Sequence, residues 1–478
     1  MELDKDLRSR QETRELISKA DEAFQILKTF DQVKIDRIVE AMAKAGEEHA
    51  ARLGQMAAEE TLFGNAKDKE IKNRFASKRV HDALRGMKTV GILRKDEKNK
   101  VWDVGVPVGV IAGIVPSTNP TSTVIYKSLI ALKAGSPIVF SPHPGAVNCT
   151  KEAARLMAQA AEGAGCPKGA IGCIPTPTMD AVKELMGHPL TRLILATGGP
   201  GMVKAAYSSG KPAIGVGAGN GPAYIHKSAD IPKAVADIIR SKTFDNGTVC
   251  ASEQSVVLED CCAEAVKAEF KRQGGYFLSE QEAGKIASLL LRCDGSMNPK
   301  IVGKTACEIG KMAGLDIPAG TKVLIAHETQ AGPTRPYSRE KLCPVLAFFT
   351  ERNEDTVLKR AIEVLLGEGA GHTFCLHARD EAVITRFALQ IPVSRFLVNT
   401  PASLGGVGFS TNLFPALTLG CGAVGGSSSS NNIGPLDLIN IRRVAWGTEE
   451  SAAGTPTENT DSALIEHLTQ EILRRLGK

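Results

Sequence analysis

The chain has 478 residues, more than one ordinary hydrophobic core holds, so we expect two or three domains. A hydrophobic fraction of 43% and a charged fraction of 23% are typical of a soluble globular protein. The net charge of +5 is small for this length, and Lys and Arg form no run interleaved with aromatic residues, so the sequence carries no nucleic-acid footprint.

Residues up to about 90 have the apolar period of helices. The charged first residues, Met1-Glu-Leu-Asp-Lys5, lack the apolar core of a secretory signal. One apolar stripe then consists of Leu16, Ala20, Ala23, Phe24, Leu27 and Phe30. A second begins with Val33, Ile35, Ile38, Val39 and Met42. Both stripes predict helices packed through one face.

From Val101 onward, strand-like and helix-like runs alternate. Strands are predicted at 106–115, 137–140, 171–174, 193–196 and 213–216, with helices at 127–134, 152–163, 180–186 and 202–208. A similar alternation resumes after Cys250, at 255–257, 263–273, 322–327, 345–349, 374–376 and 396–398. This pattern predicts parallel sheets with helical crossovers, in two α/β units that meet near residues 240–250.

Residues 448–460 are rich in Ser, Thr, Gly, Ala and Glu and predict a flexible linker. Residues 461–478 predict an amphipathic helix, whose apolar face consists of Leu464, Ile465, Leu468, Ile472, Leu473 and Leu476. A short helix on a tether buries little apolar surface within its own fold. The face is therefore interpreted as a docking surface.

The cysteines indicate a reducing compartment. There are eleven, an odd number, and none forms a Cys-x-x-Cys pair, which argues against a disulfide framework and against a zinc site. The longest apolar stretch, residues 104–115, is short and broken by Gly and Pro, so no membrane span is expected.

Cys250 and Asn119 are the first candidates for chemistry. Cys250 follows a glycine-bearing loop just before a predicted strand, which suits a nucleophile, although most cysteines are buried and structural. Asn119 follows the carboxyl end of a predicted strand, where α/β sheets bind ligands. Its amide can donate to a developing oxyanion, but Asn-Pro is also a routine turn sequence.

Two glycine clusters and one histidine add further candidates. Residues 197–201 lie between a predicted strand and a predicted helix, where free N–H groups bind phosphate. Residues 215–221 do not match the Gly-x-Gly-x-x-Gly fingerprint and predict a close backbone approach instead. His372, between glycines and a strand, is placed to titrate near neutral pH, or to serve as a hydrogen-bonded loop residue.

Taken in order, these pieces resemble the aldehyde dehydrogenase superfamily. More narrowly, they resemble its CoA-acylating branch, which includes the acetaldehyde and propionaldehyde dehydrogenases of bacterial microcompartments and the aldehyde half of bifunctional aldehyde–alcohol dehydrogenases. The resemblance runs from about residue 5 to residue 447. The matching segments are 109–120, 196–201, 215–222, 244–253, 340–346 and 371–373.

The resemblance implies an α/β aldehyde dehydrogenase fold. Such a fold has a Rossmann-like cofactor domain, an α/β catalytic domain and a β arm for oligomerisation. On this chain it implies an NAD(CoA)-binding domain at 1–240, with an arm strand near 98–108, and a catalytic domain at 241–425. An oligomerisation or return segment at 426–447, the linker at 448–460 and the helix at 461–478 follow.

The same resemblance assigns roles to residues. Cys250 takes the place of the nucleophile, Asn119 that of the oxyanion donor, and Glu340 that of the glutamate that contacts the nicotinamide ribose. His372 is the candidate base for Cys250 or for the incoming thiol. The expected cofactor-binding residues are Pro116, Ser117, Ser141, His143, Thr197, Gly198, Gly199, Gly201, Gly217 and Glu340, with no metal.

Two departures from the hydrolytic members matter. Those enzymes have a glutamate base at the head of a Glu-Leu-Gly-Gly motif, and alignment on Pro222 puts Val216 in that place. Without a carboxylate there, no base activates water, and the acyl group waits for the CoA thiol. At Ser141-Pro-His143-Pro the hydrolytic relatives usually have a lysine for the adenosine ribose, so that contact does not carry over directly.

The expected function is NAD-dependent oxidation of acetaldehyde or propionaldehyde to acyl-CoA through a Cys250 thioester. The expected partners are a second copy or three further copies of the chain and a microcompartment shell bound through the helix at 461–478, which implies a location inside a microcompartment of the bacterial cytoplasm. Neither nucleic acid nor a membrane is expected. The alternatives are another small aldehyde such as sulfoacetaldehyde, a hydrolytic acid-forming enzyme, a helix that packs on a neighbouring subunit, and a scaffold with a vestigial site. A scaffold should have lost Cys250 or Asn119.

Overall fold

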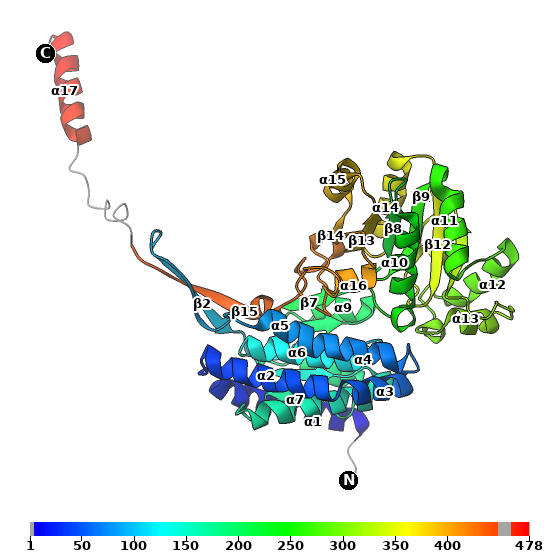
Figure 1. Ribbon diagram of the computed structural model, residues 1–478. Coiled ribbons are helices and arrows are strands. Elements are labelled where there is room, and N and C mark those ends of the chain that lie inside the picture. The colour runs from blue at the N-terminus through cyan, green and yellow to red at the C-terminus, as the bar shows by residue number, and fades with distance from the viewer. Residues whose placement is uncertain (1–3, 448–459, 478) are drawn as a thin grey trace. The chain divides into compact units, whose positions relative to one another are not determined.

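The computed structural model describes residues 4–447 and 460–477 (Figure 1). The described chain divides into two units. The larger consists of the residues up to Gly91 together with Val106–Asn440, and the smaller of Ile92–Gly105 and the residues from Ile441 onward.

Helices open the larger unit. They are α1 (Lys5–Leu27), α2 (Gln32–Glu48), α3 (Ala50–Thr61), α4 (Ala66–Arg74), a π-helical turn at Phe75–Arg79, and α5 (Val80–Leu84). Asp4, Asp31 and Asn65 cap α1, α2 and α4 by accepting backbone N–H groups. Most of the two predicted stripes is confirmed, and only Val33, which is 69% exposed, departs clearly from it. The buried members are Ala20, Ala23, Leu27, Ile35, Ile38, Val39 and Met42.

A five-stranded parallel sheet follows in the order β5-β4-β3-β6-β7. Its strands are β3 (Val110–Ile114), β4 (Ile138–Ser141), β5 (Ile171–Cys173), β6 (Thr191–Thr197) and β7 (Ala213–Val216), and its helices are α6 (Pro120–Lys133), α7 (Val147–Gly163), α8 (Met179–Gly187) and α9 (Pro200–Tyr207). The chain runs outward from β3 to β5 and then returns to β6 on the other side of β3. This reversal is the switch point at which doubly wound sheets bind ligands.

Both faces of this sheet are buried, as its continuous apolar strands require. Along β3, Ile111 belongs to the core shared with α2, α6 and α7, whereas Val110 and Ala112 belong to the core shared with α1 and α8. Successive side chains of a strand point to opposite faces, so a single strand contributes to both cores.

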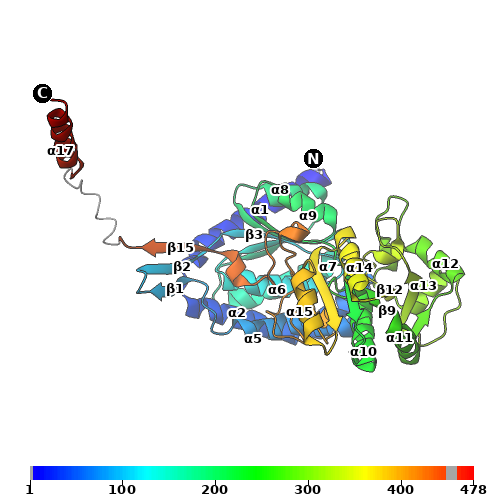
Figure 2. The same ribbon diagram turned by 90° about the horizontal axis from the view of Figure 1, so that it is seen from above.

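A seven-stranded parallel sheet has the order β10-β11-β12-β9-β8-β13-β14. Its strands are β8 (Gly221–Ile225), β9 (Glu253–Glu259), β10 (Gly275–Phe277), β11 (Val323–Glu328), β12 (Val345–Glu351), β13 (Gly371–His377) and β14 (Val393–Val398). Its helices are α10 (Ile231–Thr243), α11 (Asp260–Gln273), α12 (Glu280–Leu290), α13 (Ala306–Met312), α14 (Glu354–Gly367), α15 (Glu381–Gln390) and α16 (Ala402–Gly406). Figure 2 gives a second view of both sheets and their helices.

The boundary between the two α/β units was predicted near residues 240–250, too far toward the C-terminus. The predicted cofactor domain 1–240 is therefore too long. The chain changes sheets between Val216, which ends β7, and Gly221, which begins β8. β8 pairs with β9, with Ala223 opposite Val256, so β8 and the following α10 belong to the seven-stranded sheet. Alternation predicts that a strand exists but not which sheet it joins, because its pairing partner is set by tertiary packing.

The smaller unit contains a three-stranded sheet in the order β1-β2-β15. The strands are β1 (Gly91–Asp96), β2 (Val101–Pro107) and β15 (Ile439–Ala445). Asp103 on the central strand pairs with Arg94 at 3.4 Å and with Arg443 at 3.2 Å. The arm strand expected near 98–108 corresponds to β2, and the return segment 426–447 contains β15. The single strand predicted at 106–115 is wrong, because the chain leaves β2 and turns at Gly109, with φ 110°, before β3.

Helix α17 (Thr460–Arg475) matches the helix predicted at 461–478. The side chains of its apolar face, which are Leu464, Ile465, Leu468, Ile472, Leu473 and Leu476, are exposed. Most of the predicted linker, residues 448–459, lies outside the described residues. Within residues 4–447 and 460–477, no helix has both the length and the apolar character that crossing a membrane requires.

Candidate active site

A cavity of about 430 Å³ lies where the carboxyl end of the five-stranded sheet meets the amino end of the seven-stranded sheet. The loops after β3, β4 and β6 line it from one side, and the segments before β8, β9 and β12 from the other. It gathers most of the predicted site residues, namely Pro116, Ser117, Asn119, His143, Thr197, Gly198, Gly199, Gly217, Cys250 and Glu340.

His372, Ser141 and Gly201 do not line the cavity. Ser141 ends β4 with 1% of its surface exposed, and Gly201 lies inside α9. His372 is buried in β13, with its Nδ1 at 2.9 Å from the Thr373 hydroxyl, and burial lowers its pKa to about 3. Direct proton transfer between His372 and a thiol in the cavity is therefore not supported by this geometry.

Cys250 reaches the cavity from the turn before β9 and is half-buried. A side chain at Gly219 would lie 2.0 Å from the Cys250 carbonyl oxygen, so only glycine fits beside it. The expected close approach of the 215–221 segment is thus made to the backbone of the candidate nucleophile. Burial raises the pKa of Cys250 to about 12, Glu340 adds to the effect, and Arg395 opposes it. The sulfur is consequently a neutral thiol at pH 7.

Asn119 lies in the loop after β3, and Pro120 begins α6 directly behind it. Its amide nitrogen donates to the Thr248 carbonyl at 3.3 Å and to the Thr118 hydroxyl at 3.2 Å. Thr248 precedes Cys250 by two residues. The amide of Asn119 therefore lies beside the segment that carries the candidate nucleophile.

Three further residues of the site were not found from the sequence. Lys69 and Lys72 on α4 are buried against the carboxylate of Asp245, at 3.0 Å and 2.5 Å. Asp245 lies within segment 244–253, which carries the family resemblance, and this was the sequence signal that could have identified it. The lysines belong to a strongly polar helix, whose pattern is that of a solvent-exposed one.

The residues present fit a bound dinucleotide. The Thr197 hydroxyl oxygen is buried and has no hydrogen-bond partner among the described residues. Gly199 and Gly217 have nothing within 4 Å of the place a side chain would occupy, so a ligand can approach the backbone closely. Helix α9 begins at Pro200, and its free N–H groups suit a phosphate.

Glu340 connects two segments on the same side of the cavity. Its Oε1 accepts the Gly219 backbone N–H at 2.8 Å, next to the contact between Gly219 and Cys250. Burial raises the pKa of Glu340 to about 8, against the opposing effect of the Gly219 N–H. His143, on the opposite side, accepts the Gly145 N–H at Nδ1 at 3.0 Å, and burial lowers its pKa.

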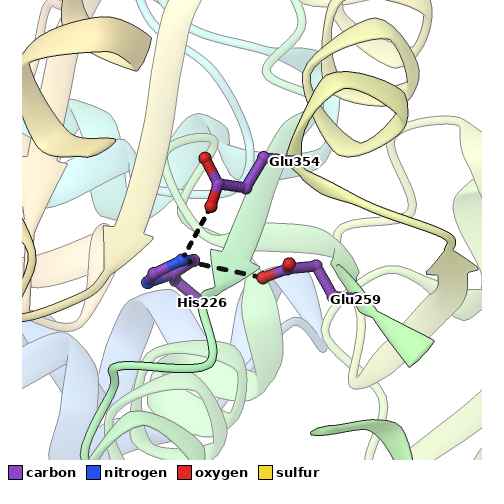
Figure 3. Close-up of side chains that lie close together, drawn as sticks. All are labelled: His226, Glu259 and Glu354. Atoms are coloured by element: carbon purple, nitrogen blue, oxygen red, sulfur yellow. Dashed lines mark ion pairs between the residues drawn. The ribbon is translucent and has the colours of Figure 1, made fainter. Parts of the chain in front are cut away.

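A second polar cluster lies at the other end of the seven-stranded sheet (Figure 3). His226 follows β8, Glu259 ends β9, and Glu354 begins α14. The His226 Nε2 lies 3.4 Å from Glu354 and 3.7 Å from Glu259, with both carboxylates aimed at the ring. Residues of these types can hold a divalent metal only if Nε2 presents its lone pair.

The hydrogen bonds of His226 place its proton on Nε2. The Ser228 oxygen accepts the backbone N–H groups of Arg379 and Asp380, so its own proton points to the His226 Nδ1 at 2.8 Å. The Ser228 backbone N–H donates to the same nitrogen at 3.2 Å. Lys227 also pairs with both carboxylates, at 3.2 Å each. We assign the two carboxylates to the ion pairs with Lys227 rather than to metal binding.

The aldehyde dehydrogenase family model matches residues 6–274. The chain is 45% identical over 439 residues to the bifunctional aldehyde-alcohol dehydrogenase of Escherichia coli, which covers 91% of this chain and 49% of that protein. The chain thus spans about half the length of the curated relatives it matches first. It is 35% identical to the succinate-semialdehyde dehydrogenase (acetylating) of Clostridium kluyveri, over 92% of this chain and 96% of that one.

Solved structures agree with the fold. An acetylating aldehyde dehydrogenase from Geobacillus thermoglucosidasius is 53% identical with a TM-score of 0.92, over 93% of this chain and 98% of that one. A propionaldehyde dehydrogenase from the fucose utilisation microcompartment of Clostridium phytofermentans is 30% identical with a TM-score of 0.83, over 91% and 97%. A propionaldehyde dehydrogenase from Rhodopseudomonas palustris, solved with CoA bound and its cysteine acylated, is 27% identical with a TM-score of 0.82, over 91% and 97%.

The raised pKa of Cys250 predicts its reactivity in the free protein. With a pKa of about 12, the thiolate fraction rises tenfold for each pH unit, and somewhat less above pH 8, where Glu340 ionises. Alkylation of Cys250 by iodoacetamide, followed by mass spectrometry of its peptide, should therefore be about 50-fold to 100-fold faster at pH 9 than at pH 7. A rate that levels off below pH 8 would show that the free thiol is already activated.

Proposed function

The chain belongs to the aldehyde dehydrogenase family, and from this premise we propose that it oxidises a short-chain aldehyde to an acyl-CoA through a thioester on Cys250. Acetaldehyde and propionaldehyde are the proposed substrates, and NAD is the proposed hydride acceptor. The observation that carries the proposal is Val216, which lines the cavity with Cys250 and Asn119 and is 3% exposed.

A hydrolytic enzyme needs a base that activates water beside the thioester. The family resemblance puts Val216 at the position of that base, and valine has no group that accepts a proton. The acidic side chains among the described cavity residues are Glu340 and Glu368. Glu368 pairs with Arg339 at 2.8 Å, and Glu340 accepts the Gly219 N–H. Both carboxylates are therefore engaged, which favours a second thiol over water as the acceptor of the acyl group.

The reaction begins at the Cys250 sulfur. It forms a bond to the aldehyde carbon while its proton passes to a water molecule. The carbonyl oxygen becomes an oxyanion and accepts hydrogen bonds from the Asn119 amide and the Cys250 backbone N–H. One such donor lowers the barrier by ~3 kcal/mol. The nicotinamide supplies the hydride acceptor when it is bound. The acyl group then stays on Cys250 until the CoA thiol displaces it, and Cys250 leaves as thiol in a ping-pong sequence.

The cavity suits an uncharged aldehyde. Its cationic side chains among the described residues are Lys72, His143 and Arg339. Lys72 is held by Asp245 and Arg339 by Glu368, and His143 remains neutral because burial lowers its pKa. Much of the remaining lining is apolar, with Phe75, Phe244, Val249, Leu404, Val407, Phe409, Leu417 and Leu419. A carboxylate or sulfonate on the substrate would lose water there without gaining a free cation.

We assign the two remaining parts to assembly. The β1-β2-β15 sheet exposes Ile441 and Val444, and Trp446 directly after β15 is also exposed. An edge of such a sheet can pair with another chain, which suits a homodimer or homotetramer. The exposed apolar face of α17 suits docking to the shell of a bacterial microcompartment, as expected for a relative of the Clostridium phytofermentans enzyme.

Without CoA, the enzyme should release one NADH per active site in a burst and then stall, because the acyl group stays on Cys250. With CoA it should turn over, and acyl-CoA should exceed free acid by at least about tenfold. Cys250→Ala should abolish both the burst and the turnover. Cys173→Ala is the matched control, since Cys173 is equally half-buried with a pKa of about 12 and lies outside the cavity lining. Rapid acid formation without CoA would contradict the acylating role.

The charge of the cavity predicts substrate preference. We expect kcat/KM for propionaldehyde to exceed that for succinate semialdehyde and for sulfoacetaldehyde by about 100-fold or more, since a buried anion without a partner costs several kcal/mol. Initial rates with each aldehyde at fixed NAD and CoA measure this ratio. Equal efficiencies would mean that a cation in the cavity becomes available to the substrate.

The docking role of α17 can be tested without touching the catalytic unit. Leu468→Glu combined with Ile472→Glu places charge on the apolar face and should abolish co-sedimentation with shells while activity is retained. Gln470→Glu, on the polar face, is the matched control and should still co-sediment. Loss of the oligomer in the double variant would instead identify α17 as a contact between subunits.

A further inference from the structure

A lysine donates a hydrogen bond to the side-chain oxygen of Asn119. The Lys72 Nζ lies 2.5 Å from the Asn119 Oδ1, 3.0 Å from the Thr248 hydroxyl and 2.5 Å from Asp245. Lys72 comes from α4, Asn119 from the loop after β3, and Thr248 from the turn before Cys250. One ammonium group therefore joins the three segments around the candidate oxyanion site.

An ammonium group only donates hydrogen bonds, so it determines which end of the amide faces it. The oxygen of Asn119 must point to Lys72, and the NH₂ group must then point the other way, where it meets the Thr248 carbonyl at 3.3 Å. The two ends of an asparagine amide are nearly equal in shape, and packing alone does not distinguish them. The charge of Lys72 does.

We propose that Lys72 is a positioning residue, which orients the Asn119 amide so that its NH₂ group faces the oxyanion formed on the Cys250 adduct. This inference rests on the proposed function, because the oxyanion arises only in that chemistry. It assigns Lys72 no contact with the reacting atoms. Lys72 affects the rate only by orienting the amide of Asn119.

Asp245 keeps the lysine charged and in place. It is fully buried, and it accepts from Lys72, from Lys69 at 3.0 Å, from the Thr248 hydroxyl at 2.7 Å and from the Asn65 N–H at 2.9 Å. Burial would raise the pKa of Asp245, but the two ammonium groups outweigh it and hold the pKa below its ordinary value. In turn, burial lowers the pKa of Lys72 to about 8, against the stabilising charge of Asp245.

The backbone at Asp245 connects this network to Cys250. Asp245, Asn246 and Gly247 all have left-handed backbones, with φ of 48°, 51° and 81°. Residues other than glycine rarely adopt this backbone conformation, and here the neighbouring groups hold it in place. The Asp245 N–H donates to Asp68 at 2.8 Å, and the Asn246 amide donates to the Gly303 carbonyl at 2.9 Å. The carboxylate that fixes Lys72 thus also belongs to the turn that leads into the nucleophile.

The decisive test is a double-mutant cycle between Lys72 and Asn119. Lys72→Met keeps the length of the side chain and removes the donor. We expect kcat for acyl-CoA formation to fall by about 100-fold, the effect of losing one oxyanion donor, while KM for the aldehyde changes by less than about threefold. In an Asn119→Ala background, Lys72→Met should lower kcat by less than about twofold.

Lys69→Met is the matched control. Lys69 is equally buried on the same helix and pairs with the same carboxylate, but it does not contact the Asn119 side chain. We expect a lower Tm for this variant and a kcat reduced by less than about tenfold. Lys72→Gln provides a second variant should Lys72→Met fold poorly, and its smaller loss should likewise require Asn119.

The outcomes separate two failures. A wild-type enzyme that forms no NADH from aldehyde, NAD and CoA would overturn the proposed function. An active wild type in which Lys72→Met retains full kcat, or loses as much kcat in the Asn119→Ala background as in the wild type, would overturn the positioning role alone. A Lys69→Met variant as impaired in kcat as Lys72→Met would also overturn it, since the loss would then follow from Asp245 rather than from the amide.

Discussion

The close contact between Gly219 and Cys250 is the constraint on which the site depends. The segment before β8 and the turn before β9 approach so closely that a β-carbon at Gly219 would lie 2.0 Å from the Cys250 oxygen. This contact sets the candidate nucleophile, Cys250, at the amino end of one sheet, opposite the carboxyl end of the other. The N–H of the same glycine also binds Glu340, so one residue without a side chain positions two functional groups.

Buried charge holds the other half of the site together. Water has almost no access to the side chains of Lys69, Lys72 and Asp245. Removing one partner from such a buried group typically lowers the stability of the fold by ~3–5 kcal/mol. Burying these charges costs desolvation free energy that an apolar core of the same shape would not lose. The buried charges fix the orientation of the hydrogen-bonding groups around them, whereas apolar packing specifies only volume. The role proposed for Asn119, donation to one oxygen atom, depends on that orientation.

The electrostatics of the cavity favour neutral reactants. Cys250 is a neutral thiol, Glu340 has a raised pKa, and Lys72 and Arg339 are already paired with carboxylates. In the proposed reaction, charge therefore develops mainly at the oxyanion, to which the Asn119 amide is proposed to donate. A preorganised donor in a dry cavity does not need to reorganise when the charge appears, and this is the main source of its effect on the rate.

The sequence by itself determined many of the elements and the candidate nucleophile. Apolar periods of 3.6 and 2 report which face of a local segment is buried, so α1, α2, α17 and most strands were predicted from them, and the segment 244–253 singled out Cys250. Only the tertiary structure decided that β8 joins the second sheet, that His372 is buried away from the cavity, and that Lys72 is a buried residue of the site. Lys72 and Asp245 are 173 residues apart, and neither periodicity nor local motif carries information about a pairing over that distance. Such contacts arise when packed elements bring distant side chains together.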